Sequence, residues 1–462
     1  MSLATVPLQV DATAVAEALN FTWILVASFL IFFMHAGFAM LEAGQVRSKN
    51  VANQLTKNML TWALGVVTFF LVGAGVSSLV GTGEFTWVAG ADPSTWASGW
   101  LYGAVFAMTA ATIVSGAVAG RAKLRAYASY TILLAAIIYP VVTGITWSGS
   151  LIADWVGVGF HDFAGGMIVH GMGGIAGLTA AWVLGPRLDR YNEDGSVNVI
   201  PGHSLTFAVL GTLILAFGWY GFNVGTAAIF TSGESGLLFN GAVLGRVALT
   251  TTLAMAMGAV GAGAMALART GKVDTLYVAN GLLAGLVAIT AIPDTTTWWG
   301  ALVIGLVAGG QLPLVFGLVE RRLKIDDVCA VFPVHGSAGV LGALAYPFVA
   351  VSLPDGVSLG GAVLAQLTGV VVIAAWTVLA TAAVFGVLKA LGQARVTPEH
   401  ERKGLDVSEH GVETYPEFSL GDEAVADGGR VLGAGGAGTE VRPDGGDRPD
   451  DACVRSRGGE RE

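Results

Sequence analysis

The sequence predicts an all-α polytopic membrane protein, and three observations lead to this fold class. The chain has 462 residues, of which 54% are hydrophobic and only 12% are charged, about half the charged fraction of a typical soluble domain. Apolar stretches recur along it, each near the about 20 residues that cross the membrane as a helix, which is too long for barrel strands. The 66 glycines fit close helix–helix contact in a bilayer.

Eleven apolar stretches are long enough to span the membrane. Residues 1–20 contain Asp11 and Glu17 but no basic residue, so they lack the positive region of a secretion signal, and we expect them to form an extracellular segment. The last stretch is unusually long, and we expect it to lie at the periphery of the bundle. The predicted spans are 21–43, 57–80, 100–120, 126–147, 163–185, 203–225, 238–266, 275–293, 298–319, 331–350 and 359–391.

The basic residues of the loops alternate from one side of the predicted bundle to the other. Every loop that follows an odd-numbered span carries Lys or Arg, whereas loops after even-numbered spans carry neither. The positive-inside rule then places the N-terminus outside and the C-terminus in the cytoplasm. The basic residues are Arg47, Lys49 and Lys57; Arg121, Lys123 and Arg125; Arg187 and Arg190; Arg269 and Lys272; and Arg321, Arg322 and Lys324.

Two histidines, His170 and His335, lie in uncharged glycine-rich runs, each within a Val-His-Gly sequence. An ionisable side chain in hydrocarbon is costly, so such residues usually face a cavity, a partner or a pathway. If spans 1–5 and 6–10 form two five-helix inverted repeats, the histidines lie on antiparallel helices and can meet near the midplane. A hydrogen bond between helices, with no transport, is the alternative interpretation.

The chain after the last span changes composition. Residues 392–420 are charged and interrupted by proline, whereas residues 421–462 contain few large apolar residues and are predicted to be a disordered, acidic, Gly-rich tail. The domains are therefore 1–20, 21–391, 392–420 and 421–462. The net charge of -9 does not indicate an acidic partner, and no nucleic acid is expected. Cys329 and Cys453 are far apart, so neither a disulfide nor a metal site is expected.

The segment from Asp162 to His170 reads DFAGGMIVH and resembles the signature of the ammonium transporter (Amt/Mep/Rh) family. This resemblance covers about residues 20–420. It implies a homotrimer in the cell membrane, with one conduction path per subunit, ammonium or ammonia as substrate and no enzymatic activity or cofactor. It also makes 392–420 a cytoplasmic regulatory element that packs against the neighbouring subunit, with a possible PII-type signal protein as partner. Other similar segments are 38–44, 47–51, 218–223, 326–327 before 334–336, and 397–406.

The resemblance further implies an outer site that recruits ammonium. This site maps to Trp147, Phe106 and Thr226, with Tyr102 at a neighbouring aromatic position. An aromatic face attracts a desolvated cation by about 2 kcal/mol or more, and a hydroxyl accepts one of its hydrogens. Thr226 stands where the family usually has serine, and its extra methyl group bears on affinity and selectivity.

Beyond this site the resemblance implies a gate formed by Phe106 and Phe222, with Trp219 nearby. His170 and His335 would line the pore below the gate as a twin-histidine pair. Burial disfavours a charged imidazole, and a neutral imidazole both donates and accepts a hydrogen bond, so the pair is suited to bind ammonia and pass a proton.

Four other polar residues near the predicted pore are given structural roles. We expect Asp162 to be an exposed acid that caps its helix, and the resemblance implies that it acts electrostatically near the cation site with its carboxylate held by backbone donors. Asp326 and Asp327 are interpreted as a solvated charge cluster that helps to start span 10, and Ala330 stands where many relatives have a further acid. His35 is expected to pack and hydrogen-bond between helices or subunits.

Together these patterns predict ammonium transport: recruitment at the outer site, loss of a proton near the gate, and passage of ammonia along an apolar pore. Crossing as a neutral molecule avoids the cost of dehydrating a charge. Alternatives are an ammonium sensor that signals through its cytoplasmic tail, a bis-histidine haem protein using two of His35, His170 and His335, and an Rh-type channel for ammonia or carbon dioxide. No Walker-type motif is present, so primary pumping is not expected.

Overall fold

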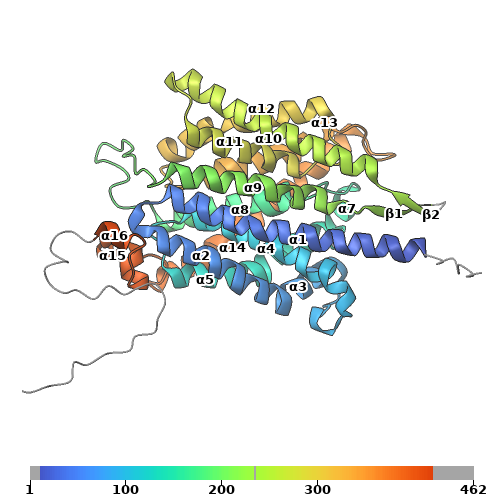
Figure 1. Cartoon of the computed structure of the whole chain (residues 1–462), viewed down its shortest axis with the longest axis horizontal. Helices are drawn as coiled ribbons and strands as arrows, with labels where there is room; N and C mark the ends of the chain where they lie inside the picture. The colour runs from blue at the N-terminus through green and yellow to red at the C-terminus, as the bar shows by residue number, and fades with distance from the viewer. Residues whose placement is uncertain (1–10, 234–235, 420–462) are drawn as a thin grey trace, which may run out of the picture. The chain divides into compact units, whose positions relative to one another are not determined.

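Long helices lie side by side and form the body of the molecule (Figure 1). The computed structural model describes residues 11–233 and 236–419. The chain divides after Thr414 into two units, and of the second only the short helix α16 (Pro416–Ser419) is described. The predicted disordered tail, 421–462, lies outside the described residues. In the first unit, the start of α1 and a small β-hairpin lie at one end, and helix α15 lies at the opposite end.

The predicted class, a mostly helical multi-pass membrane protein, is confirmed. Within the described residues, nine helical segments are long and apolar enough to cross a membrane, and each coincides with a predicted span. They are α1 (Ala12–Gln45), the segment Ser48–Thr82 with α2 (Val51–Thr68) and α3 (Ala74–Thr82), Ala97–Ala117 with α4 (Tyr102–Ala117), Leu124–Thr146 with α5 (Leu124–Leu133) and α6 (Tyr139–Thr146), Gly166–Leu184 with α8 (Met172–Leu184), α9 (Leu205–Thr226), α10 (Gly241–Thr270), Trp298–Arg322 with α12 (Trp298–Gly317), and α14 (Leu359–Ala390).

The two remaining predicted spans coincide with shorter helices. Span 8 corresponds to α11 (Thr275–Thr290), and span 10 corresponds to a π-helical turn, η9 (Phe332–Gly336), followed by α13 (Ser337–Val349). The number of eleven crossings and the orientation of the chain therefore stay predictions, and "outer" and "inner" below refer to the predicted sides.

Predicted boundaries differ from the structure in several spans, and two of these differences have a clear local cause. Helix α1 begins at Ala12 rather than near Phe21, because the carboxylate of Asp11 accepts the N–H of Thr13 and caps the first turn. Span 7 was expected to begin at 238, but strands β1 (Phe230–Gly233) and β2 (Gly236–Phe239) form an antiparallel hairpin there, and α10 begins after it. The apolar residues of β2 account for the error, since a short apolar run is compatible with either a strand or a helix.

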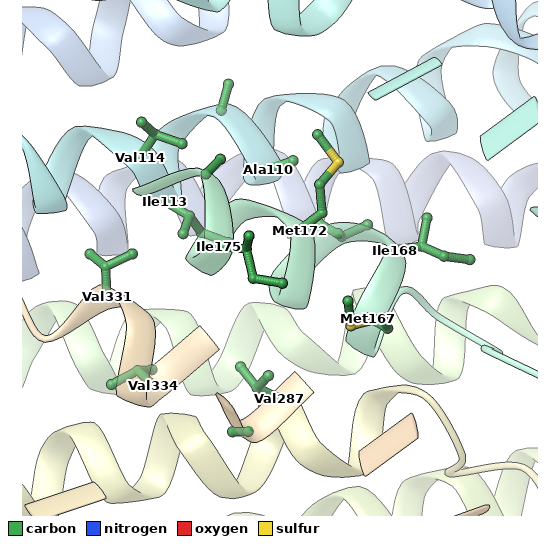
Figure 2. Packing of buried hydrophobic residues seen from close by; sticks show 14 of the residues in the cluster. Ala110, Ile113, Val114, Met167, Ile168, Met172, Ile175, Val287, Val331 and Val334 are labelled. Atoms are coloured by element: carbon green, nitrogen blue, oxygen red, sulfur yellow. The ribbon is translucent and has the colours of Figure 1, made fainter. Parts of the chain in front are cut away.

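The core lies where α4, α8, α11 and η9 meet (Figure 2). Ile113, Met172, Val287 and Val334 are buried together there, although they come from four different predicted spans. Close approach of the backbones makes this possible at Gly174, where an added Cβ would lie 2.1 Å from the backbone nitrogen of Gly336. The result is an apolar sheath around the segments that carry the two histidines.

The segment after α14 folds against the inner loops of its own chain. It contains α15 (Pro398–Lys403), which begins where the Thr397 hydroxyl accepts the N–H of His400, and a π-helical turn at Asp406–His410. The backbone N–H of Val396 donates to the carbonyl of Arg121. Residues 392–414 are thus an ordered part of the first unit, joined to the ends of the helices. A further short helix, α7 (Leu151–Val156), lies between α6 and α8 in the sequence.

Candidate functional site

The two sequence-predicted histidines meet in the centre of the helix bundle. His170 lies in the π-helical turn η7 (Gly166–Gly171) and His335 lies in η9. Their ring centroids are 5.4 Å apart and their planes differ by 14°. Both side chains are buried, with exposed fractions of 0% and 5%. The pairing predicted from the matching sequence contexts is therefore present, between segments separated by more than 160 residues.

Each histidine turn is preceded by an aspartate eight residues upstream. The carboxylate of Asp162 accepts the backbone N–H groups of Gly165, Gly166, Met167 and Ile168, all at 2.8 Å. Near the other histidine, Asp327 accepts two backbone N–H groups. Such capping satisfies N–H donors that the start of a helix leaves unpaired. Each π-helical turn that carries a histidine is therefore held at its N-terminal end by an aspartate.

Asp162 differs from the prediction in one respect, because it is buried (5% exposed) rather than exposed. Burial raises the pKa of this carboxyl, the four backbone N–H donors lower it, and the pKa that results is about 6. The four donors offset part of the cost of removing the carboxylate from water, which is why an acid can lie here.

The histidine rings face aromatic and aliphatic side chains. The ring of His170 stacks on Trp219, with centroids 4.6 Å apart and planes 17° apart, and the ring of His335 lies 6.1 Å from Phe38. The indole N–H of Trp219 donates to the hydroxyl of Thr290 at 2.8 Å, which fixes the indole. Figure 2 shows Val287 and Val334 among the apolar residues of this region. Both nitrogens of His170 and Nδ1 of His335 have no hydrogen-bond partner among the described residues. Unpaired buried polar atoms call for an explanation such as a small polar guest.

The predicted outer site lines an open cavity of about 540 Å³. Tyr102, Phe106, Trp147 and Thr226 all contribute to its wall. Phe106 lies at the centre of this group, with its ring centroid 4.8 Å from that of Tyr102 and 5.9 Å from that of Trp147. The hydroxyl of Thr226 lies 2.9 Å from the hydroxyl of Tyr102 and donates to the carbonyl of Phe222. The structure therefore brings the four predicted residues together around one space.

The two predicted gate residues separate this cavity from the histidines. The ring centroids of Phe106 and Phe222 are 4.1 Å apart, and Phe222 lies 5.3 Å from the ring of His170. Both phenylalanines are buried. The indole N–H of Trp147 donates to the backbone carbonyl of Asp162 at 2.7 Å, so the outer site and the first histidine turn are joined directly.

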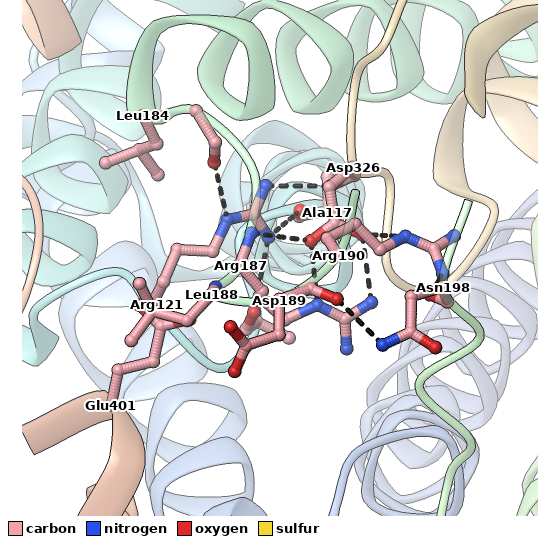
Figure 3. A network of polar contacts seen from close by, with 12 residues as sticks. Ala117, Arg121, Leu184, Arg187, Leu188, Asp189, Arg190, Asn198, Asp326 and Glu401 are labelled. Atoms are coloured by element: carbon pink, nitrogen blue, oxygen red, sulfur yellow. Dashed lines mark hydrogen bonds and ion pairs between the residues drawn. The ribbon is translucent and has the colours of Figure 1, made fainter. Parts of the chain in front are cut away.

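The inner end carries an ionic network instead of aromatic rings (Figure 3). Asp326 accepts two hydrogen bonds from the guanidinium of Arg187, at 2.7 and 2.9 Å, and pairs with Arg190 at 3.2 Å. Arg121 donates to the backbone carbonyl of Asp326 at 2.7 Å. Burial would raise the pKa of Asp326, but the hydrogen bonds and charge of Arg187, with the charge of Arg121, lower it well below its ordinary value.

The prediction of a solvated cluster at Asp326 and Asp327 is wrong, because these residues are 0% and 3% exposed. The basic residues that pair with Asp326 come from other loops rather than from neighbouring 321–324, so sequence proximity gave the wrong partners. The predicted role in starting span 10 is confirmed: the Asp327 carboxylate accepts the N–H groups of Val331 and Phe332 at 2.9 and 2.7 Å. Arg121 and Arg187 belong to this arrangement and were singled out before only for topology.

The segment 392–414, which follows α14, is hydrogen-bonded to the loops that form this network. Glu401 accepts the backbone N–H of Leu188 at 2.6 Å and a hydrogen bond from Arg395 at 2.8 Å. Asp406 accepts the backbone N–H of Asn53 at 2.9 Å. These contacts link residues 392–414 to the loops that carry Arg187 and to the start of α2. The inner face of the protein is therefore one connected polar assembly.

His35 packs in α1 with an exposed fraction of 7%, and neither ring nitrogen has a hydrogen-bond partner among the described residues. The expected packing is present, whereas a hydrogen bond to another helix of the same chain is not found in the described part of the chain. The π-helical form of both histidine turns was not predicted. The only available signal was the glycine content of these segments, which does not distinguish a π-turn from close helix packing.

Comparisons with known proteins agree on one family. The sequence profile of the Ammonium Transporter Family matches residues 22–415. "Ammonium transporter Amt2" of Haloferax mediterranei is 64% identical over 430 residues, which cover 90% of this chain and 94% of the relative. "Ammonium transporter Amt1" of the same organism is 50% identical over 450 residues, covering 92% and 86%.

Solved structures show the same fold. A structure titled "Sensor Amt Protein" has a TM-score of 0.78 and 32% identity, and the match covers 86% of this chain and 100% of that one. Mep2 of Saccharomyces cerevisiae has a TM-score of 0.68 and 26% identity, with 82% and 90% covered. The relatives thus match the chain over nearly all of the region that the helices occupy.

Proposed function

This chain belongs to the ammonium transporter family, a family of multi-pass membrane proteins rather than enzymes, and from that premise we propose how it transports ammonium. Ammonium is recruited in the outer aromatic cavity, loses a proton at the phenylalanine gate, and crosses as ammonia past the two histidines. The substrate, ammonium or ammonia, follows from the family. The route and the roles of individual residues are our proposal.

The observation that carries this mechanism is the histidine pair. Two imidazoles lie 5.4 Å apart between centroids in an apolar sheath, and three of their four nitrogens have no partner among the described residues. A neutral imidazole offers one donor and one acceptor, which match the acceptor and donors of ammonia. The surrounding apolar side chains offer nothing to a charged ion that has lost its water. The pair therefore favours ammonia over ammonium at this point.

The outer cavity is suited to the step before. Its rings at Phe106 and Trp147 present aromatic surface to a cation, an attraction of about 2 kcal/mol or more when the cation is desolvated. The Thr226 hydroxyl donates to the carbonyl of Phe222, so its oxygen accepts from the Tyr102 hydroxyl and keeps a second lone pair for a cation. Potassium has no proton to lose, so it cannot continue as a neutral species and stops at the gate.

The two histidine segments support an inverted repeat. Each has an aspartate cap eight residues before the histidine and a glycine four residues after it. The contacts are reciprocal: an added Cβ at Gly174 would meet Gly336, and one at Gly339 would meet Gly171 at 2.8 Å. Each of these glycines thus packs on the residue that directly follows the opposite histidine, as expected for two segments related by a pseudo-twofold axis.

The assembly and its regulation are also proposals. We expect a homotrimer with one pore per subunit, and the ordered element 392–414 as the surface through which a cytoplasmic PII-type protein acts. The element is suited to such a role because Glu401 joins it to the loop that carries Arg187, and Arg187 binds Asp326 next to the cap of the His335 turn. Cross-linking of the purified protein would give the subunit number.

An ammonium sensor is a second candidate. A structural relative with a TM-score of 0.78 is titled "Sensor Amt Protein", and the same outer site would serve a sensor. The two functions differ in flux: a sensor binds ammonium without transporting it, whereas a transporter moves ammonium into liposomes.

The proposal is tested by reconstituting the full chain in liposomes and recording current and uptake after ammonium pulses. The wild type should take up ammonium, and His170→Ala should lose selective uptake. His400→Ala, which changes an exposed histidine of α15, is the matched control and should behave as the wild type. Selective uptake by His170→Ala at the wild-type rate would contradict the mechanism, and binding without flux in the wild type would favour the sensor.

A further inference from the structure

Glu42 is a buried acid near the inner end of α1 that the mechanism above does not use. Its exposed fraction is 2%, and it lies within an apolar stretch of the helix. An ionisable residue in such a position is costly and usually has a function and a defined partner. Its partners come from α2 and α4, so three helices converge on one carboxylate.

Two amide side chains of α2 fix one oxygen of this carboxylate. Gln54 and Asn58 donate from their NH₂ groups to Oε2 of Glu42, at 2.7 and 2.6 Å. The amide of Asn58 is itself oriented, because the hydroxyl of Thr112 donates to its oxygen at 2.7 Å and leaves only the NH₂ group to face Glu42. The arrangement therefore supports the charged form of the carboxylate.

Ser115 on α4 allows the same site to hold a protonated carboxyl. Its hydroxyl oxygen lies 2.8 and 2.7 Å from the two carboxylate oxygens and 2.7 Å from the backbone carbonyl of Thr112. A hydroxyl has one hydrogen and two lone pairs. When Glu42 is charged, Ser115 donates to it; when Glu42 is protonated, Glu42 donates to Ser115, which turns its hydrogen to Thr112. Both protonation states are thus fully hydrogen-bonded.

The carboxylate and the second histidine share one internal cavity. Glu42 and His335 both contribute to its wall, together with Phe38, Asn280, Cys329 and Val334. The cavity leaves about 10 Å³ for the centre of a water-sized molecule, roughly the room that one water or one ammonia needs. A molecule that enters this cavity from the histidines therefore lies beside Glu42.

We propose that Glu42 is the proton-exchange group at the inner end of the pore. The carboxylate accepts a proton from the protonated imidazole of His335, and its new O–H bond then breaks as ammonia in the cavity takes that proton. The products are a neutral imidazole, a carboxylate and an ammonium ion that leaves toward the cytoplasm. No other reactant is needed. This role rests on the proposed function, since it requires that ammonia and a proton reach the inner cavity.

Other titratable groups near Glu42 define what its charge state depends on. These are His335 across the cavity, Cys329 beside it, Lys57 on α2 and Tyr127 on α5. The Nζ atom of Lys57 is buried and has no hydrogen-bond partner among the described residues, and its positive charge favours the charged form of the Glu42 carboxylate. A purely structural polar clamp between helices is the competing explanation for Glu42, and it predicts no change in the proton coupling of transport.

The test uses the full chain in liposomes, with ammonium pulses recorded as current and as internal pH at several external pH values. Glu42→Gln keeps the size of the side chain but cannot exchange a proton. We expect its charge-coupled transport to fall about 100-fold, the lower end of what a positioned proton donor contributes. Glu193→Gln is the control: Glu193 is an exposed acid in the loop between α8 and α9, so its variant should keep the wild-type current.

Ser115→Ala tests the same role without removing the carboxylate. This variant removes a hydrogen bond from both forms of Glu42, but the charged form keeps two amide donors whereas the protonated form loses its acceptor. The pH at which the current is half-maximal should therefore shift, whereas a polar clamp would change stability alone. A wild-type current and pH profile in Glu42→Gln would overturn the proposal while leaving the proposed function intact. If Glu42→Gln does not fold, an unchanged pH profile in Ser115→Ala overturns it. A wild type that moves no ammonium would refute both.

Discussion

The two ends of the proposed pore differ in the residues that form them, although the two histidines between them lie in similar π-helical turns. The outer end is an open cavity of about 540 Å³ lined by aromatic rings and hydroxyls. The inner end has a cavity with room for about one small molecule and a network of buried arginines and acids, to which Glu401 joins residues 392–414. In our proposal the open aromatic end collects and desolvates a cation, whereas the charged inner end positions the turn that carries the second histidine.

The ionic network should give the largest effect when it is broken. Asp326→Asn leaves Arg187 and Arg190 without their carboxylate, and removing one partner of a buried pair costs about 3–5 kcal/mol. The free energy of unfolding in detergent should fall by this amount. The folded-state pKa of Asp326 is lowered, so its stabilisation is present above the ordinary aspartate pKa and is lost as the pH falls toward the folded-state value.

Asp189→Asn is the control for that measurement. Asp189 is an exposed acid in the same loop as Arg187, and asparagine tolerates its positive φ of 60°. Its stability should change by less than about 0.5 kcal/mol. Equal effects of the two variants would show that the buried pairing is not what stabilises the inner end.

The two aspartate caps provide the next comparison. Asp162 holds four backbone N–H groups and Asp327 holds two, so more buried donors lose their acceptor when the outer cap is removed. We expect Asp162→Ala to cost about 3 kcal/mol and Asp327→Ala about half of that. Chemical unfolding of both variants under one condition measures the ratio. A larger loss at Asp327 would reverse our view of which cap carries more of the stability.

The outer cavity should respond in affinity rather than stability. Trp147→Leu removes one aromatic wall, and a loss of about 2 kcal/mol of cation attraction raises the half-saturating ammonium concentration about 30-fold. Trp182→Leu, in which the tryptophan of α8 is 63% exposed, should leave it unchanged. If both variants lowered the affinity alike, the effect would belong to the membrane interface and not to the cavity.

The smallest effect is expected at Thr226. Thr226→Ser keeps the hydroxyl that donates to the Phe222 carbonyl and removes only a methyl group, which is worth about 1 kcal/mol or less. The half-saturating concentration should shift by no more than about fivefold. Thr226→Val, which has a similar size but no hydroxyl, should weaken binding further. If the valine variant bound as well as the serine variant, the hydroxyl would have no part in the site.

The sequence predicted much of this arrangement because membrane helices depend on simple rules. Hydropathy located the nine long apolar helical segments of the described residues. The matching contexts of His170 and His335 predicted that the two side chains lie close together. The resemblance to a known family predicted that Tyr102, Phe106, Trp147 and Thr226 share one site, and all four line one cavity. These inferences succeeded because apolar length and repeated motifs are local properties of the chain.

The errors concern the burial of acidic residues, which depends on polar partners that are positioned only in the folded chain. Asp326 was assigned to a solvated cluster because Arg321, Arg322 and Lys324 are near it in the sequence, yet its partners are Arg187 and Arg190 from another loop. The burial of Asp162 was missed because the four N–H groups that stabilise it become available only when the turn at Gly165 forms, with a φ of 90°. Such partners are set by the three-dimensional packing and leave no periodic signal.

The account depends on ammonia, and not a charged ion, passing between the two imidazoles. Current from liposomes exposed in turn to ammonium and to potassium tests this most directly in the wild type, in His170→Ala and in His335→Ala. We predict that the wild type responds to ammonium alone, and that both variants lose this discrimination, either by falling silent or by conducting potassium. Full ammonium current with potassium still excluded in both variants would contradict the account.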